Sequence, residues 1–218
     1  MRPVAIYGAG GLGREVLMLI RQVNLAAPTW EPVGFFDDAI PALQSIHGLP
    51  ILGGMQSLNG WKGQLYIVIA VGDPAAKKEI LSGITNPAIR FATLIHPSVQ
   101  REVFQNITFG EGSIIAAGNI ITTDISIGNH VLLNLNCTIG HDVHIGDFSS
   151  IMPGCNISGE VEIGEGTYIG TGAAIINRIR TGPYSTIGAG AAVIKDVSPH
   201  ATAVGIPAKE LNRKALRK

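Results

Sequence analysis

The sequence is poor in charge, in cysteine and in long apolar runs. Charged residues make up 15% of the 218 positions, and 16 basic residues balance 16 acidic ones. A chain without net charge has no field that favours nucleic acid or an anionic membrane. No stretch has the roughly 18 uninterrupted apolar residues of a membrane span, and the Gly-rich turn at Gly8 comes too early for a signal-peptide core. We therefore expect a cytoplasmic protein with neither nucleic-acid nor membrane partners.

The chain does contain one long regular pattern. From Val103 to Val193 a large apolar residue falls on every sixth position, with Thr181 as the exception. The position four residues after each of these anchors is mostly small or β-branched, and glycine often follows the anchor directly. The anchors are Val103, Phe109, Ile115, Ile121, Ile127, Leu133, Ile139, Ile145, Ile151, Ile157, Ile163, Ile169, Ile175, Thr181, Ile187 and Val193.

A period of six matches neither an α-helix nor a single β-strand, but it is typical of short strands joined by corners in a parallel solenoid. Each hexad forms one side of a triangular coil of about 18 residues, and successive coils stack about 4.8 Å apart. The anchor and the small residue point inward. We expect the glycine after the anchor to adopt a positive φ at the corner, where it has no Cβ to clash. The scarcity of charge suits a solenoid whose flat faces pack against other subunits.

The two cysteines, Cys137 and Cys155, are one coil apart and stack in the same inward column. They are near enough to bridge, but two small apolar wall residues, kept reduced in the cytosol, are the simpler interpretation. The sequence has no Cys, His and Asp spacing typical of structural zinc, and we expect no metal.

The first 90 residues alternate strand and helix patterns. PVAIY, VGFFDD and LYIVIAVGD read as strands, and the last of them has the continuous apolar run of a strand buried on both faces. REVLMLIRQVN has apolar residues at helical spacing, and Pro74 opens a second helix in PAAKKEILSGI. The pattern predicts a small Rossmann-like βαβ domain with its loops at the carboxyl edge of a parallel sheet.

A glycine motif, G-x-G-x-x-G at Gly8, Gly10 and Gly13, lies between the first strand and helix, and Asp37 and Asp38 end the next strand. Backbone N–H groups at such a turn face a phosphate, and the carboxylates can accept ribose hydroxyls. The motif alone suggests a dinucleotide enzyme, but the domain ends before a second mononucleotide-binding half. A nucleotide that carries a sugar is the better candidate. A turn that only packs strand on helix is the alternative.

The stretch FATLIHPS leads into the repeats, with His96 as a linker or packing residue. After Val193 we expect the chain to leave the coil, and its basic end, which includes Lys209, Arg213, Lys214, Arg217 and Lys218, to form a short helix. We divide the chain into a nucleotide-sugar-binding domain (1–90), a β-helix domain (91–205) and a basic tail (206–218).

One histidine is a candidate catalyst. His141 lies two residues past an anchor and precedes Asp142, so it projects from a corner beside a carboxylate. An imidazole titrates close to neutral pH and is suited to accept a proton there, and an adjacent acid orients it. An ordinary surface histidine is the alternative. His130 and His144 are weaker candidates, because neither has an adjacent acid together with a flanking glycine.

These features together resemble the bacterial hexapeptide-repeat sugar acetyltransferases, the group of the sialic acid O-acetyltransferases and the N-acetyltransferases of nucleotide-linked 4-amino sugars. The resemblance covers the whole chain and rests on YGAGGLGREV, IGHDVHIGD and GIPAK. It implies a left-handed β-helix, although the general crossover rule predicts the opposite hand. It also implies acetyl-CoA as co-substrate, a homotrimer, and active sites between neighbouring subunits.

The resemblance implies roles for single residues as well. His141 corresponds to the family's general base and Asp142 to the acid beside it. Gly159 corresponds to the glycine whose N–H donates to the thioester carbonyl. Ser150 stands where many relatives have a second histidine that contacts the acetyl group, and a hydroxyl cannot carry its positive charge. The other implied contacts are Thr171, Ala189, Pro207, Ala208 and Lys209 for CoA, and Gly10, Gly11, Leu12, Asp37, Asp38, Gly72 and Asp73 for the nucleotide sugar.

We therefore expect acetyl transfer from acetyl-CoA to the amine of a nucleotide-linked amino sugar. O-acetylation of a sugar hydroxyl, as in sialic acid, is the alternative reaction. A non-catalytic trimeric scaffold or sensor that binds a nucleotide sugar is the alternative of another class, and Ser150 slightly favours it. A dinucleotide-dependent oxidoreductase is the least favoured, because no catalytic domain complements the turn.

Overall fold

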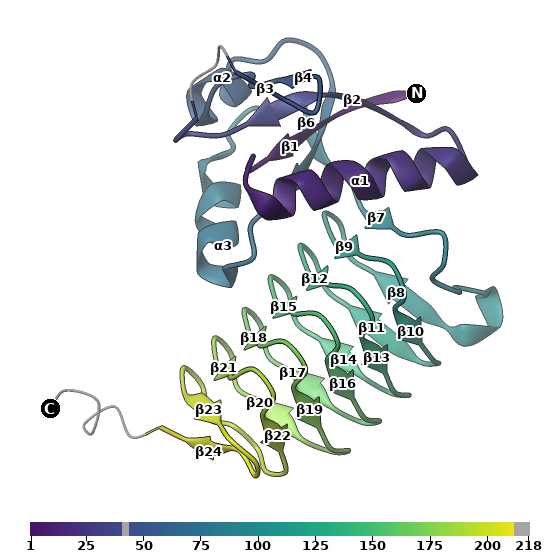
Figure 1. The fold of residues 1–218 in the computed structure, drawn as a ribbon, viewed down its shortest axis with the longest axis vertical. Coiled ribbons are helices and arrows are strands. Elements are labelled where there is room, and N and C mark those ends of the chain that lie inside the picture. The colour runs from purple at the N-terminus through teal and green to yellow at the C-terminus, as the bar shows by residue number, and fades with distance from the viewer. Residues whose placement is uncertain (41–43, 212–218) are drawn as a thin grey trace, which may run out of the picture.

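In a computed structural model, which describes residues 1–40 and 44–211, the chain forms an N-terminal α/β domain followed by a parallel β-helix (Figure 1). The main sheet of the domain is parallel, with the strand order β2-β1-β5-β6. The elements of the domain are β1 (Arg2–Tyr7), α1 (Gly11–Ala26), β2 (Trp30–Phe36), β3 (Ser45–Ile46), β4 (Leu49–Pro50), α2 (Met55–Asn59), β5 (Leu65–Ile69), α3 (Pro74–Gly83) and β6 (Ile89–Phe91).

The β-helix has three faces, each a sheet whose parallel strands come from successive coils. Face 1 contains β7 (Leu94–Ile95), β9 (Ile114–Ile115), β12 (Leu132–Leu133), β15 (Ser150–Ile151), β18 (Tyr168–Ile169), β21 (Thr186–Ile187) and β23 (Thr202–Val204), and β24 (Lys209–Glu210) adds to it antiparallel. Face 2 contains β10 (Ile120–Ile121), β13 (Thr138–Ile139), β16 (Asn156–Ile157), β19 (Ala174–Ile175) and β22 (Ala192–Val193). Face 3 contains β8 (Ile107–Phe109), β11 (Ile125–Ile127), β14 (His144–Ile145), β17 (Glu162–Ile163) and β20 (Arg180–Thr181).

The inward columns are those that the repeat predicts. Most anchors are buried in one continuous core together with the small residues four places later, and Cys137 and Cys155 are fully buried free thiols in that core. Thr181, the one polar anchor, is also buried, and its hydroxyl lies 3.4 Å from that of Thr167. Stacked aliphatic side chains removed from water supply the main stabilisation of such a solenoid.

The corner glycines serve a purpose different from the one expected. Positive φ occurs three residues after the anchor, as at Asp142 (φ 58°) and Gly154 (φ 71°), and not at the glycine that follows the anchor directly. A Cβ on Gly146 or Gly170 would lie 2.6 Å from a backbone nitrogen of the next coil. Close stacking of the coils, and not backbone conformation, therefore requires glycine after the anchor.

The two ends of the repeat differ from the prediction. Val103 is 98% exposed in a short 3-10 helix, η1 (Val103–Gln105), so it is not an inward anchor. At the other end the coil continues beyond Val193, because β23 pairs parallel with β21. Thr186 pairs with Thr202 there, a spacing of 16 residues, whereas Ile120 pairs with Thr138 at a spacing of 18. The shortened coil breaks the six-residue period, which hides it in the sequence.

The basic end falls only partly within the described residues. Lys209 is exposed in the antiparallel strand β24 and not in a helix. The remainder of the predicted helix, with Arg213, Lys214, Arg217 and Lys218, lies outside the described residues.

The N-terminal domain lies against face 1 of the β-helix, with α1 and α3 facing the coils (Figure 1). Val16 and Leu19 of α1 belong to one buried cluster with Ile114 and Leu132 of face 1. Two lines of corners, named by the faces that they join, run along the β-helix. Edge 1–2 contains residues 116–118, 134–136, 152–154, 170–172 and 188–190, and edge 2–3 contains residues 122–124, 140–142, 158–160 and 176–178.

Candidate active site

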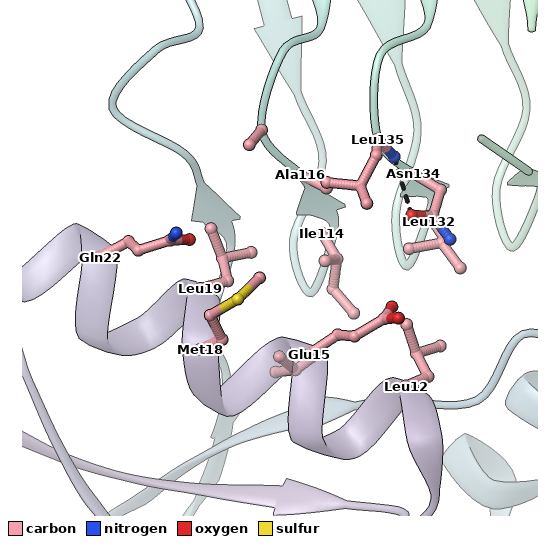
Figure 2. A pocket seen from close by; sticks show the side chains of 12 residues that line it. Leu12, Glu15, Met18, Leu19, Gln22, Ile114, Ala116, Leu132, Asn134 and Leu135 are labelled. Atoms are coloured by element: carbon pink, nitrogen blue, oxygen red, sulfur yellow. Dashed lines mark hydrogen bonds between the residues drawn. The ribbon is translucent and has the colours of Figure 1, made fainter. Parts of the chain in front are cut away.

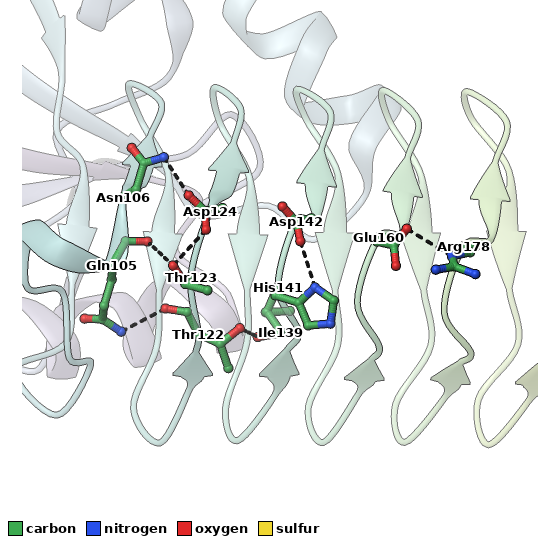
Figure 3. A network of polar contacts seen from close by, with 10 residues as sticks. All are labelled: Gln105, Asn106, Thr122, Thr123, Asp124, Ile139, His141, Asp142, Glu160 and Arg178. Carbon is green, nitrogen blue, oxygen red and sulfur yellow. Dashed lines mark hydrogen bonds and ion pairs between the residues drawn. The ribbon is translucent and has the colours of Figure 1, made fainter.

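The predicted base and its acid form a hydrogen-bonded pair on edge 2–3. His141 Nδ1 lies 2.8 Å from Asp142 Oδ2, and both side chains are 58% exposed (Figure 3). Asp142 has a left-handed backbone conformation, which aspartate tolerates better than most residues. With Nδ1–H donated to the carboxylate, the lone pair lies on Nε2, so the ring is oriented to accept a proton there.

Gly159 lies one coil above His141 on the same edge, against the imidazole. A Cβ at Gly159 would lie 2.5 Å from His141 Nε2, so a side chain here would collide with the ring. Within the part of the chain that the structure describes, the Gly159 N–H has no hydrogen-bond acceptor, whereas its carbonyl accepts from Arg178 N. The free N–H and the imidazole therefore lie next to each other.

Edge 2–3 carries a column of charged and polar side chains above and below this pair (Figure 3). Glu160 pairs with Arg178 at 3.0 Å, and this contact lowers the pKa of the Glu160 carboxyl. On the other side, Asp124 accepts from Asn106 at 2.8 Å. Because its neighbours are already paired, the His141–Asp142 pair is the part of this edge that is left to act on another molecule.

The Gly-rich turn forms at the carboxyl end of β1, as expected. Gly8 has φ 102°, and a Cβ there would lie 2.9 Å from Ala70 O; a Cβ on Gly13 would strike the Gly8 carbonyl, which explains glycine at both positions. Gly10 and Gly11 face open space, and no side chain among residues 1–40 and 44–211 caps the N-terminus of α1. Unpaired N–H groups at a helix N-terminus favour a phosphate.

The acidic residues of the predicted nucleotide site have structural partners. Asp37 accepts from Ala9 N at 2.8 Å and from Ala39 N at 2.9 Å. Asp38 accepts from Met55 N at 2.8 Å and from the Tyr7 hydroxyl, and burial together with Asp38 raises the pKa of Tyr7. Asp73 caps α3 by accepting from Ala76 N at 2.8 Å. These carboxylates shape the loops around the Gly-rich turn, and a ribose would share oxygens that are already hydrogen-bonded.

A cavity that the sequence did not indicate lies between α1 and the coils (Figure 2). Its volume is about 230 Å³, and most of its lining is apolar. The Gln22 side-chain oxygen at this cavity is buried without a hydrogen-bond partner among the described residues. The cavity is lined by Leu12, Glu15, Val16, Met18, Leu19, Gln22, Ile114, Ala116, Ala117, Leu132, Asn134 and Leu135.

The predicted site residues fall on two different edges of the chain. His141 and Gly159 lie on edge 2–3. Leu12 shares the cavity with Asn134 and Leu135, which places the Gly-rich turn beside edge 1–2. Thr171 and Ala189 are exposed on edge 1–2, and Pro207, Ala208 and Lys209 follow β23 near β22, where Ala208 N donates to Ala192 O at 2.7 Å. One chain therefore does not bring the base and the nucleotide turn together.

Ser150, the residue predicted to contact the acetyl group, is buried within its own chain. Its side chain is fully buried on face 1, and its hydroxyl has no hydrogen-bond partner within the described residues. The N-terminal domain packs on this part of face 1, where Ile114 and Leu132 of the same column belong to one buried cluster with α1. The contact between Ser150 and the acetyl group stays a prediction.

A buried lysine, which the sequence analysis missed, joins the two domains. Lys77 of α3 is 2% exposed, and its Nζ donates to His130 O at 2.9 Å and to Ser149 O at 3.2 Å. Burial lowers the pKa of Lys77 to about 7, against the opposing effect of Asp73. His130 is buried beside it, stacked on Phe148, and burial lowers its pKa as well. The interdomain contact is therefore not purely apolar.

Lys77 makes folding stability depend on pH. The unfolded chain holds this proton up to a pH of about 10.4, whereas the folded protein releases it near 7, so stability rises with pH across that window. We expect the free energy of unfolding of the wild type to rise relative to Lys77→Met by roughly 1–3 kcal/mol between about pH 7 and about pH 9. Urea titrations at both pH values measure this difference. Lys78→Met, on the same helix but exposed, is the control without the effect; an equal change in both variants contradicts the assignment.

Within residues 1–40 and 44–211, no helix is both long and apolar enough to cross a bilayer. In the same ranges, no group of three or more His, Cys, Asp and Glu side chains is arranged to hold a metal ion.

Comparisons with known proteins match both domains. Residues 3–84 match the model of the PglD N-terminal domain, and residues 142–177 match that of the bacterial transferase hexapeptide with six repeats. No curated protein sequence matches the chain. Among solved structures, the acetyltransferase domain of PglB from Neisseria gonorrhoeae is 30% identical, with 97% of this chain and 100% of that chain covered and a TM-score of 0.88.

Two ligand complexes are also similar. The same PglB domain in complex with acetyl coenzyme A is 29% identical, with 96% and 99% of the two chains covered and a TM-score of 0.85. PerB from Caulobacter crescentus, in complex with CoA and GDP-perosamine, is 26% identical, with 97% and 98% covered and a TM-score of 0.87. These matches confirm the predicted Rossmann-like domain followed by a left-handed β-helix of hexapeptide repeats.

Proposed function

Because the chain belongs to the hexapeptide-repeat family of nucleotide amino-sugar acetyltransferases, we propose that it moves the acetyl group of acetyl-CoA to the amine of a nucleotide-linked amino sugar. The observation that carries the proposal is the His141–Asp142 pair on an exposed edge, with the free N–H of Gly159 beside it. The ligands of the similar structures, acetyl coenzyme A in PglB and GDP-perosamine in PerB, support the two substrates. Since acetyl-CoA is a cytoplasmic metabolite, we place the reaction in the cytoplasm.

The residues have defined tasks in this reaction. The sugar nitrogen attacks the thioester carbonyl carbon, and His141 Nε2 accepts the proton that this nitrogen loses, directly or through one water. Asp142 stabilises the imidazolium that forms. The Gly159 N–H meets the charge that develops on the carbonyl oxygen, a contribution of about 3 kcal/mol for one such donor. The carbon–sulfur bond then breaks, and the CoA thiolate leaves with the proton from His141.

The nucleotide sugar is held by the N-terminal domain in this proposal. The diphosphate lies on the open turn at Gly10 and Gly11, at the uncapped N-terminus of α1. Gly72 and Asp73 flank it from the start of α3. Residues 1–90 thus bind the nucleotide, and residues 91–205 carry the acetyl transfer. Thr171, Ala189, Pro207 and Lys209 remain the proposed CoA contacts.

The separation of the two edges supports a homotrimer with shared sites. One side of a coil, six residues or about 20 Å of extended strand, separates edge 1–2 from edge 2–3, so His141 of one chain stays away from the nucleotide turn of the same chain. The first coils of face 1 are covered by the N-terminal domain, and face 3 presents charges such as the Arg180–Glu162 pair. Face 2 presents uncharged side chains outward. These are Ile120, Thr138, Asn156, Ala174 and Ala192.

Face 2 is therefore the surface that suits a second copy. If face 2 of three protomers surrounds a common axis, edge 2–3 of each protomer meets edge 1–2 of the next, and the ring closes by a heterologous contact. His141 of one protomer then faces the nucleotide turn of its neighbour. Each active site takes its base from one chain and its acceptor from the other.

Release of the CoA thiol tests the proposed reaction. We expect release with acetyl-CoA and nucleotide-linked amino sugars, and none with free sugars that offer only hydroxyls. Release with a free sugar such as sialic acid and not with the amines would establish the O-acetylation alternative. Binding of nucleotide sugars without release for any acceptor would establish a non-catalytic scaffold and overturn the proposal.

A further inference from the structure

Two large apolar side chains project into solvent from the first coil. Val103 is 98% exposed and Phe104 is 83% exposed, next to each other in η1. Exposing such a pair forgoes roughly 1.5–3 kcal/mol of burial for each side chain. An exposed apolar pair of this kind marks a contact surface when the structure holds it rigidly.

The segment that carries this pair is held firmly. Gln105 donates to Ile121 O and to Thr122 O, both at 3.0 Å. Glu102 and Gln105 form a capping box across η1, and Gln105 O accepts from Asp124 N at 2.8 Å. The hydrogen bonds tie η1 to the corner of the next coil, so Val103 and Phe104 are presented at a fixed place on edge 2–3.

The same molecule has an apolar cavity on the opposite edge of face 2. Met18 of α1 lines this cavity and is 45% exposed (Figure 2). Ala117 of edge 1–2 also lines it. Leu19 and Ile114 form its buried floor. The cavity is built from the N-terminal domain and the coils together, so it exists only where α1 rests on face 1.

The pair and the cavity lie at matching heights along the β-helix. His141 is in the same coil as Asn134, the end of the cavity near the nucleotide turn. Gln105 of η1 lies one coil below Thr123, which itself lies one coil below His141, so η1 is two coils below the base. On face 1, Leu94 of β7 belongs to the coil that carries η1, and it is in one buried cluster with Leu19 of α1. An arrangement that sets His141 of one protomer level with the nucleotide turn of the next therefore sets η1 level with the coil on which Leu19, next to Met18, is packed.

We propose that Val103 and Phe104 of one protomer pack into the Met18 end of the cavity of the next protomer. The proposal rests on the shared active site of the proposed function, because it continues the contact that brings the two edges together. The three contacts close a ring. This contact, here called the clasp, fixes the height at which the two edges meet, two coils from the base, so it also sets the register of the shared site.

Disulfide trapping tests this contact without relying on activity. In the double variant Phe104→Cys with Met18→Cys, oxidation is expected to give a covalent trimer on a non-reducing gel, and each single variant none. The native Cys137 and Cys155 are fully buried and do not interfere. Phe104→Cys with Ile206→Cys, an 80% exposed residue at the far end of the described chain, is the matched control. Crosslinking of the control alone, or of neither, overturns the proposal.

A charge in the clasp tests its contribution to assembly. We expect Phe104→Asp to raise the dissociation constant of the trimer, measured by sedimentation, more than tenfold. The carboxylate would be buried unpaired in an apolar cavity. Ile206→Asp is expected to leave assembly unchanged. A trimer of Phe104→Asp as stable as the wild type contradicts the clasp. Failure of the proposed function is a separate result, because it appears as absent thiol release in the wild type while the trapping result stands.

Discussion

His141→Ala is expected to lower kcat for thiol release by roughly a hundredfold to ten-thousandfold, the usual contribution of a positioned general base. The exposed imidazole is held by Asp142 at 2.8 Å and faces away from the core, so its removal leaves no cavity in the fold. The KM for the nucleotide sugar is expected to change little, because the proposed binding turn lies on the other edge. Steady-state assays of thiol release with one nucleotide amino sugar measure both constants.

The acid beside the base provides the matched control. Asp142→Asn keeps a side chain that tolerates the left-handed backbone at φ 58° but removes the negative charge. We expect a loss smaller than that of His141→Ala, and circular dichroism and oligomeric state unchanged in both variants. Full activity of His141→Ala in a folded trimer contradicts the assignment of the base.

The arrangement of the β-helix could be predicted because one physical demand repeats in every coil. Each side needs a large inward residue and a small one, so the same packing requirement recurs at Ile139, Ile145 and Ile151. The same periodicity placed His141 on a corner, where the structure shows it exposed. Sequence spacing is therefore informative wherever the geometry is a strict repeat.

The remaining features depend on contacts between distant segments. Ser150 occupies an ordinary outward position of a hexad, and only the docking of the N-terminal domain on face 1 buries it. Lys77 reads as an exposed helical lysine, yet it donates to Ser149 O, 72 positions away. Local patterns do not carry such information, because either residue would look the same on a solvent-facing side.

At the corners, the glycine after each anchor was correctly identified, but the reason given for it was wrong. Glycine after the anchor was predicted, but the left-handed backbone lies two residues later, where Asp142 and Glu160 also occur. The glycines are needed instead because neighbouring coils approach to within 2.6 Å of the missing Cβ. Glycine can be required by a left-handed backbone or by close stacking of coils. The distance between coils, which the sequence does not contain, distinguishes these two reasons.

Gly159→Ala is expected to lower kcat by a factor comparable to that of His141→Ala. The new methyl group would lie 2.5 Å from Nε2 and 2.6 Å from Cε1 of His141, closer than real carbon contacts allow. The ring must turn away from the position that Asp142 supports, and a displacement of this size near the reacting atoms removes much of the benefit of orientation. The assay is again thiol release, combined with a pH profile of kcat.

Folding is not expected to suffer from this substitution. Gly159 does not have a positive φ, so alanine is compatible with its backbone, and alanine restricts the unfolded chain more than glycine does. Asn177→Ala, one coil further along the same column, is the control that keeps both activity and stability. A wild-type kcat in Gly159→Ala would contradict this prediction. It would mean that the reaction does not require His141 Nε2 to lie beside the Gly159 N–H.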